Sequence, residues 1–156
     1  IEELLDHLQA RGHRRVAYVA GPERSWMNAR RAEAIDDAAR RRRIAMAPVA
    51  GGDPTTDGGR AAFEHVAASS ASAVIAYNDL MAIGILQAAQ ESGLLVPRDL
   101  AVSGFDDIFG STFTSPSLTT VASPLEAVAE RAVAELVGVP VDAEPLPTRL
   151  IVRGTT

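Results

Sequence analysis

The sequence contains no cysteine and no lysine, and aromatic residues make up only 4% of its 156 positions. Without cysteine, the chain can form no disulfide, thiolate nucleophile or cysteine-based metal site. No stretch approaches the ~20 consecutive apolar residues of a membrane span. The first residues show neither the basic start nor the apolar run of a signal peptide. These absences predict a cytoplasmic protein with no membrane partner.

Positive charge is also scarce, because 20 acidic residues outweigh 15 arginines and give a net charge of -5. Domains that bind nucleic acid normally present a basic face to the phosphates, so we do not expect this chain itself to bind DNA. The run Arg40 to Arg43 is the exception. It falls at the end of an expected helix, where cations complement the helix dipole, and we favour that interpretation over a nucleic-acid patch.

Short apolar runs alternate with helical patterns along the whole chain. Strands are expected at 16–20, 44–50, 73–77, 100–103, 118–121 and 148–152. The expected helices are one ending before Gly12, one at 26–42, one capped by Thr55 or Thr56, one at 80–92, and one at 125–137 preceded by a Ser123 cap and Pro124. Such alternation is typical of βαβ units. We therefore predict an α/β fold with a doubly wound parallel sheet and helices on both faces.

Polar residues follow the expected strands, at the edge where sheets of this kind bind ligands. Asn78 offers a donor and an acceptor, and Asp106 can accept from two neighbouring hydroxyls. With an arginine from a following helix, they would suit a small polar ligand. In the simpler alternative, Asn78 only caps its helix and Asp106 only ends a strand.

Signatures of catalysis are weak. The sequence has no G-x-G-x-x-G after the first strand, no Walker lysine motif and no G-x-S-x-G elbow, and its three histidines include no i, i+4 pair. A Mg²⁺ site at Asp106 and Asp107 would need further carboxylates, and Asp53 is the only loop acid expected nearby. We predict no catalytic residue, metal or cofactor, with an α/β enzyme as a distant alternative.

Several stretches together resemble one protein family. They are residues 7–17 (HLQARGHRRVA), 20–22 (AGP) with 28–31 (NARR), 76–84 (AYNDLMAIG), 96–107 (VPRDLAVSGFDD) and 115–121 (SPSLTTV). Their order and spacing are similar to those of the effector-binding domain of LacI-type bacterial transcription regulators. A solute-binding component of a sugar ABC importer shares that fold and is the alternative.

The resemblance implies a periplasmic-binding-protein-like (type I) fold in which two subdomains hinge around a small molecule. Residues 1–122 would form the C-terminal subdomain, 123–147 a crossover and helix belonging to the N-terminal subdomain, and 148–156 the final strand and tail. We expect the chain to be a fragment that lacks most of the N-terminal subdomain and a helix-turn-helix headpiece. The expected partners are a carbohydrate or related polar effector, operator DNA through the headpiece, and a second copy in a homodimer.

The resemblance also assigns roles to residues. Arg31, Asn78 and Asp106 match the family's effector contacts. Pro54 stands where sugar-responsive members often have an aromatic residue, and Ser123 where many have glutamine. Glu33 replaces a small or basic residue. These departures weigh against a sugar effector, and Pro54 and Ser123 are still expected ligand contacts.

The resemblance places the 80–92 helix and the segment 110–115 at the dimer interface, with Ile83, Leu86 and Phe113 as candidates. That helix has more large apolar groups than one stripe can bury. The alternative is burial in the core of its own chain, which suits Met81 and Ile85 equally well. The 125–137 helix has a broad apolar surface that we expect to associate with another copy or to pack against its own sheet.

Overall fold

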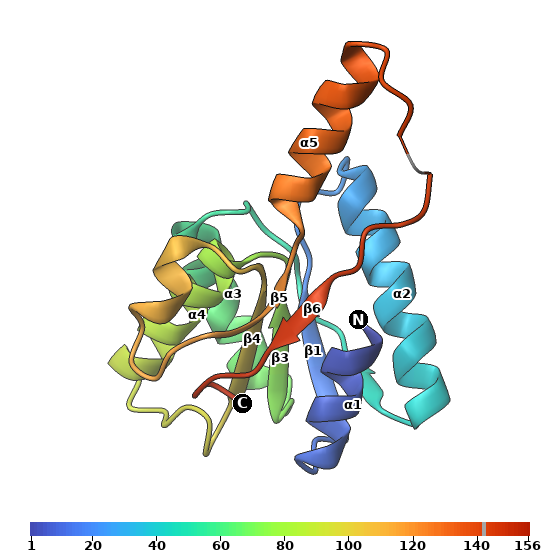
Figure 1. Ribbon diagram of the computed structural model, residues 1–156. Helices are drawn as coiled ribbons and strands as arrows, with labels where there is room; N and C mark the ends of the chain where they lie inside the picture. The colour runs from blue at the N-terminus through green and yellow to red at the C-terminus, as the bar shows by residue number, and fades with distance from the viewer. Residues whose placement is uncertain (142) are drawn as a thin grey trace.

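The computed structural model describes residues 1–141 and 143–156, which form alternating strands and helices (Figure 1). In chain order the elements are α1 (Glu2–Ala10), β1 (Arg15–Val19), α2 (Trp26–Arg42), β2 (Ala45–Ala47), α3 (Thr56–Ala68), β3 (Ala73–Ala76), α4 (Asp79–Glu91), β4 (Ala101–Asp106), the short 3-10 helix η1 (Phe109–Thr112), β5 (Thr119–Ala122), α5 (Leu125–Leu136) and β6 (Arg149–Ile151). None of the helices in these described ranges is long and apolar enough to cross a membrane.

The strands form one sheet in the order β2-β1-β3-β4-β5-β6. The pairs from β2 to β5 are parallel, which confirms the predicted fold class. The last pair, β5 with β6, is antiparallel and departs from the all-parallel expectation. The reason is the position of α5: it lies beyond the carboxyl end of β5, so the returning chain must run the opposite way (Figure 1).

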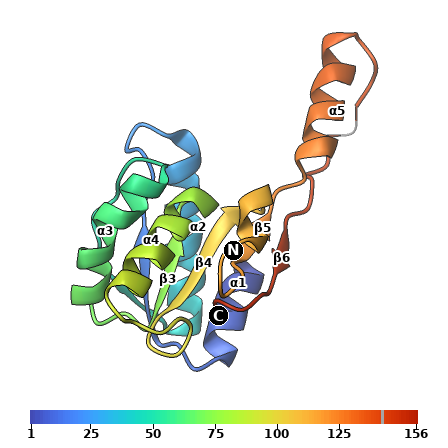
Figure 2. The same ribbon diagram turned by 90° about the vertical axis from the view of Figure 1, so that its left-hand side faces the viewer.

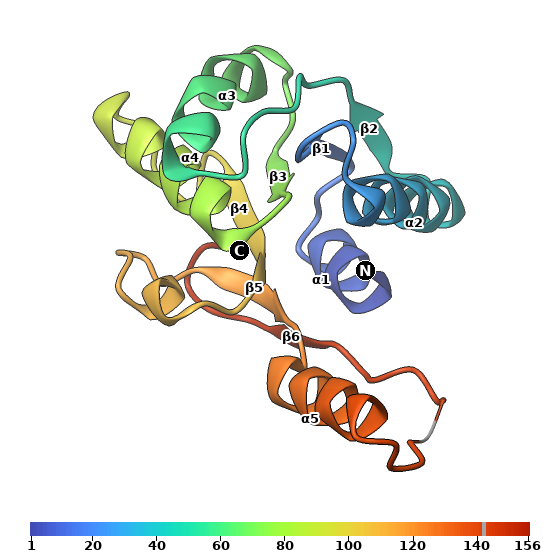
Figure 3. The same cartoon turned by 90° about the horizontal axis from the view of Figure 1, so that it is seen from above.

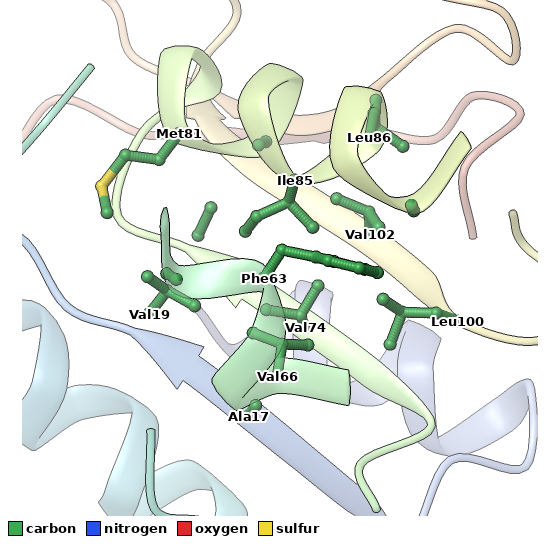
Figure 4. Close-up of a cluster of buried hydrophobic side chains, with 14 of the residues drawn as sticks. Ala17, Val19, Phe63, Val66, Val74, Met81, Ile85, Leu86, Leu100 and Val102 are labelled. Atoms are coloured by element: carbon green, nitrogen blue, oxygen red, sulfur yellow. The ribbon is translucent and has the colours of Figure 1, made fainter. Parts of the chain in front are cut away.

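Helices cover both faces of the sheet, as seen from above in Figure 3. On one face α1 and α2 contribute Leu4, Leu8 and Ile35 to a buried cluster. On the other face α3 and α4 contribute Phe63 and Ile85, which pack against β3 and β4 (Figure 4). All four residues of β3 are buried, as expected for a strand covered on both faces.

Local sequence signals set most of the helix boundaries. The Ser25 hydroxyl accepts from the Asn28 N–H at 3.2 Å and starts α2 at the predicted residue. Thr55, rather than Thr56, caps α3 by accepting from the Gly58 N–H at 3.0 Å. Gly12 adopts a φ of +92° just after α1, the left-handed conformation that glycine tolerates best.

The fifth helix, α5, projects away from the sheet and its covering helices (Figure 2). None of its residues, all within the described part of the chain, is buried, and Leu125 and Leu136 are 62% and 86% exposed. Of the two expected outcomes for this helix, packing against its own sheet is therefore wrong. The predicted Ser123 cap is wrong, because Pro124 occupies the cap position and no side chain caps the helix.

Helices α3 and α4 approach each other through glycine. A Cβ on Gly84 would lie 2.0 Å from the Thr56 carbonyl oxygen, and a Cβ on Gly59 would lie 2.0 Å from the Met81 carbonyl oxygen. These are backbone atoms that cannot move aside without separating the helices. The close approach holds α4, and the residues at its start, against the rest of the domain.

Substituting Gly84→Ala should therefore destabilise the fold by about 3 kcal/mol, because the added methyl forces α3 and α4 apart. Urea denaturation measures the loss. Gly52→Ala is the matched control, since its Cβ would meet its nearest neighbour at an ordinary 3.5 Å. Equal stabilities for the two variants would show that the helix contact is not as tight as described.

Candidate functional site

Three predicted ligand residues lie near the point where β4 and β5 end. Asp106 is the last residue of β4 and pairs with Ala122 of β5, so that Ser123 follows beside it. The Ser123 side chain and the positive charge of Arg31 both lower the pKa of the Asp106 carboxyl, which places them near it. We call Arg31, Asp106 and Ser123 the Asp106 cluster.

Arg31 is held in place by aromatic rings. Its guanidinium carbon lies 4.0 Å from the centre of the Phe105 ring and 4.9 Å from that of Tyr77. One guanidinium nitrogen donates to the Tyr77 carbonyl oxygen. Because a guanidinium has five N–H donors, Arg31 retains donors for a ligand while its position is held by the rings.

Burial raises the pKa of Asp106 above its ordinary value, and the Arg31 charge and the Ser123 hydrogen bond oppose that rise. The partly buried carboxylate therefore lacks part of the hydration that an exposed one would have. Hydroxyl groups of a bound ligand could supply the missing hydrogen bonds. The backbone here is also unusual, since Asp106 has a φ of +102°, a region seldom adopted by residues with a side chain.

Asn78 and Pro54 form a second pair at the same edge. The Asn78 Oδ1 accepts from the Met81 N–H at 2.9 Å, so Asn78 caps α4. Its Nδ2 donates to the Pro54 carbonyl oxygen at 3.1 Å. Each group of the amide keeps one further hydrogen-bonding position. The structure joins Pro54 to Asn78 through its backbone, and joins neither residue directly to the Asp106 cluster.

A hollow of about 720 Å³ opens at the ends of β1 and β2. Its lining residues are Ala20, Gly21, Pro22, Glu23, Asn28, Gly51, Gly52 and Asp53. Asn28 was not predicted as a site residue. Its Oδ1 accepts from the Tyr18 hydroxyl at 3.0 Å and from the Gly21 N–H at 2.9 Å, which shapes the loop after β1. The sequence could have indicated that Asn28 is buried, because it precedes Ile35 by seven residues and so lies on the same buried face of α2.

Asp79 is a second residue that sequence reasoning missed. It is completely buried, and its carboxylate accepts from the Thr120 hydroxyl at 2.6 Å and from the Ile108 N–H at 2.9 Å. Gly104 makes room for it, because a Cβ there would lie 2.2 Å from Asp79 Oδ1. Asp79 thus ties the start of α4 to β5 and to the turn after Asp106.

Asp107 does not join Asp106 in the cluster. Its Oδ1 accepts from Arg153 Nη2 at 2.7 Å and from the Ser111 hydroxyl at 3.1 Å. Among the described residues, no group of three or more histidine, cysteine, aspartate or glutamate side chains is arranged to hold a metal ion. The two consecutive aspartates therefore have different partners.

A separate cavity of about 550 Å³ lies between α4 and the segment after η1. Its lining includes all three predicted interface residues, Ile83, Leu86 and Phe113. Phe113 is 67% exposed and packs edge-on against Phe109, whereas Leu86 is only 9% exposed. Met81 and Ile85 are fully buried in their own core, as the alternative for them required. We call α4, η1 and this cavity the α4–η1 face.

Comparison with known proteins gives consistent matches. The sequence profile of the periplasmic binding protein-like domain family matches residues 5–156. An uncharacterized HTH-type transcriptional regulator in the aml 5' region of Streptomyces limosus is 39% identical over 142 residues, which are 83% of this chain and 38% of that protein. The chain thus spans less than half the length of this curated relative.

Solved structures agree with the fold. A sugar-binding transcriptional regulator of the LacI family from Escherichia coli, complexed with phosphate, superimposes with a TM-score of 0.89 at 28% identity, covering 99% of this chain and 59% of that one. The lac repressor dimer bound to operator and the anti-inducer ONPF also gives a TM-score of 0.89, at 30% identity, covering 99% of this chain and 57% of that one.

Burial of Asp79 predicts an unusual pH dependence of stability. Burial raises its pKa to about 6, mainly by desolvation. Between pH 4 and 6 the folded state then holds more protons than the unfolded state, so this residue makes the fold less stable as the pH rises. Asp79→Asn keeps the shape but does not titrate. Its stability relative to the parent should increase from pH 4 to pH 7, by at most about 3 kcal/mol.

Urea denaturation at several pH values measures this difference. Asp99→Asn is the opposing control, because the hydrogen bond from Arg98 holds the pKa of Asp99 below its ordinary value. Relative to the parent, that variant should lose stability as the pH rises to about 4, and the difference should then stay constant up to about pH 7. A difference for Asp79→Asn that does not change between pH 4 and 7 would contradict the raised pKa.

Proposed function

Because the chain belongs to the family of periplasmic binding protein-like domains, in the form carried by LacI-type regulators, we propose that it forms one wall of an effector-binding cleft. The effector is a small polar molecule, a carbohydrate or related metabolite, bound reversibly and not chemically changed. The chain works within a cytoplasmic transcription regulator, and its own surface does not contact DNA.

The convergence of the Asp106 cluster is the observation that carries this proposal. Arg31 offers positively charged donors, Asp106 offers acceptors, and Ser123 offers a hydroxyl that can do either. Neighbouring hydroxyls on a ligand could bond to all three residues. With Pro54 at the position where sugar-responsive members often have an aromatic residue, recognition rests on these polar contacts more than on stacking.

We assign residues 123–147 to a second subdomain, and residues 1–122 with 148–156 to the subdomain that carries the Asp106 cluster. The projection of α5 from the sheet supports this division (Figure 2). In the longer protein, the remaining part of the second subdomain would cover the apolar side of α5 and complete the cleft. A helix-turn-helix headpiece would then contact operator DNA.

Regulation follows from the closure of the two subdomains around the effector. A ligand that binds one closure angle more tightly than another shifts the population between them. A coupling free energy of only 1–3 kcal/mol changes the affinity for DNA by ~5–150-fold. No bond needs to be made or broken.

We further propose that the α4–η1 face forms the contact between two copies of the chain. Exposed Phe109 and Phe113 stand beside an apolar cavity on this face, so a symmetric pair of faces could place aromatic rings against cavities. Ile83 and Phe113 would contribute most of the contact. Leu86 would contribute less, because it is already buried in its own chain.

The effector site is tested with Asp106→Ala in the regulator that contains this chain. A thermal-shift screen of monosaccharides, disaccharides and nucleosides first identifies a ligand. The variant should bind that ligand at least about 100-fold more weakly, because a charge-assisted acceptor is lost, yet should bind operator DNA as tightly as the parent in a fluorescence anisotropy titration. Asp37→Ala, on the exposed side of α2, is the control. An unchanged ligand response would remove Asp106 from the site.

The proposed dimer contact is tested with one charged substitution on each exposed apolar surface. Ile83→Asp should weaken self-association about 100-fold, because it places an unpaired charge in the contact. Val133→Asp on α5 should leave that dimer intact. Sedimentation equilibrium measures both. If association survives Ile83→Asp but is lost in Val133→Asp, the contact between copies lies on α5 instead. A chain that stays monomeric at high concentration would contradict a contact on either surface.

A further inference from the structure

Asp107 and Arg153 meet underneath the α4–η1 face although they are 46 residues apart in the sequence. The Arg153 Nη2 lies 2.7 Å from Asp107 Oδ1, and Nη1 donates to the Leu118 carbonyl oxygen at 2.8 Å. The side chains of Arg153 and Asp107 are only 18% and 26% exposed, respectively. This ion pair is therefore partly removed from water, and losing one partner would leave the other poorly compensated.

Ser111 connects this ion pair to the surface above it. Its hydroxyl donates to Asp107 Oδ1 at 3.1 Å and accepts from Arg153 Nη1 at 3.0 Å. Ser111 is 1% exposed and belongs to η1, between Phe109 and Phe113. The pair thus holds from the inside the short segment that presents both exposed rings on the outside.

The ion pair is also close to the proposed cleft in the sequence, because Asp107 directly follows Asp106. Asp106 and Asp107 are consecutive, with φ values of +102° and +52°, and their carboxylates have separate partners. The Asp106 carboxylate lies near Ser123 and Arg31, whereas that of Asp107 accepts from Arg153. A residue with a side chain keeps a φ as large as that of Asp106 only when its surroundings hold it there. A shift of the backbone at Asp106 must therefore move Asp107 as well.

We propose that Asp107 and Arg153 are a positioning pair, which holds the α4–η1 face in the geometry needed for self-association and links that face to Asp106 in the cleft. This inference rests on the proposed dimer contact. Ligand binding at the cleft and association of two copies then influence each other, and the influence is equal in both directions.

The test measures the dimer dissociation constant of Asp107→Asn, Arg153→Gln and the double variant by sedimentation equilibrium. It is done at a temperature where circular dichroism shows every variant to be folded. Each single variant should raise the constant about tenfold, and the double variant should raise it no further, because both substitutions remove the same interaction. Arg153→Lys should restore part of the affinity, since it keeps the charge but not the forked geometry.

Arg30→Gln is the matched control, because it breaks an exposed arginine–glutamate pair on α2. If Arg153→Gln lowers only the melting temperature, and its dissociation constant stays within about twofold of this control, the pair is merely structural and the inference is wrong. Where the ion-pair variants fail to fold, Ser111→Ala removes only the connecting hydroxyl, and an unchanged dissociation constant would again overturn the inference.

The link to the cleft has its own readout. Asp106→Asn should raise the dimer dissociation constant about threefold, although Asp106 lies outside the α4–η1 face, and no change would overturn the link. The experiment distinguishes failure of this inference from failure of the proposed dimer contact. If Ile83→Asp abolishes association but the Arg153 variants do not affect it, only this inference fails. If Ile83→Asp has no effect, both fail.

Discussion

The covering of both faces of the sheet is the constraint on which the site depends. Helices pack on either side, so β3 carries only apolar side chains and polar groups that a ligand could reach collect where the strands end. Asp106 and Ser123 follow from two adjacent strand ends, and α2 adds Arg31 from the side. The cleft is thus a consequence of parallel topology, which brings the carboxyl ends of separate strands to one edge.

Buried polar groups give this edge its shape and reduce its stability at neutral pH. Asp79 joins α4, β5 and the turn after Asp106 through two hydrogen bonds, but desolvation raises its pKa. Such a residue selects one arrangement of the turns while contributing less stability than an apolar side chain could. The Asp107–Arg153 pair likewise joins segments that are distant in the sequence. Asp79 bonds to Ile108 and Arg153 bonds to Asp107, so both sets of contacts hold the segment that directly follows Asp106.

The features that the sequence predicts well are those with local causes. The bounds of α2, the Thr55 cap and the left-handed Gly12 follow from residues within one turn of each other. The features it does not predict join distant segments. Ser123 has the residue type and position of a helix cap but does not cap α5, and nothing in the periodicity pairs Arg153 with Asp107. The direction of β6 depends on where α5 ends in space.

The short outer strands have a consequence for how copies of the chain can meet. Both β2 and β6 have only three residues, and the Leu150 N–H on β6 donates to a carboxylate of Glu3 on α1 at 3.0 Å. A long, bare border strand is a template on which another chain can add its own strand. Here the template is too short, and partly occupied, to extend the sheet from one molecule into the next. Crowded copies of this domain are thereby protected from fibre-like stacking even while an apolar helix stays open to solvent.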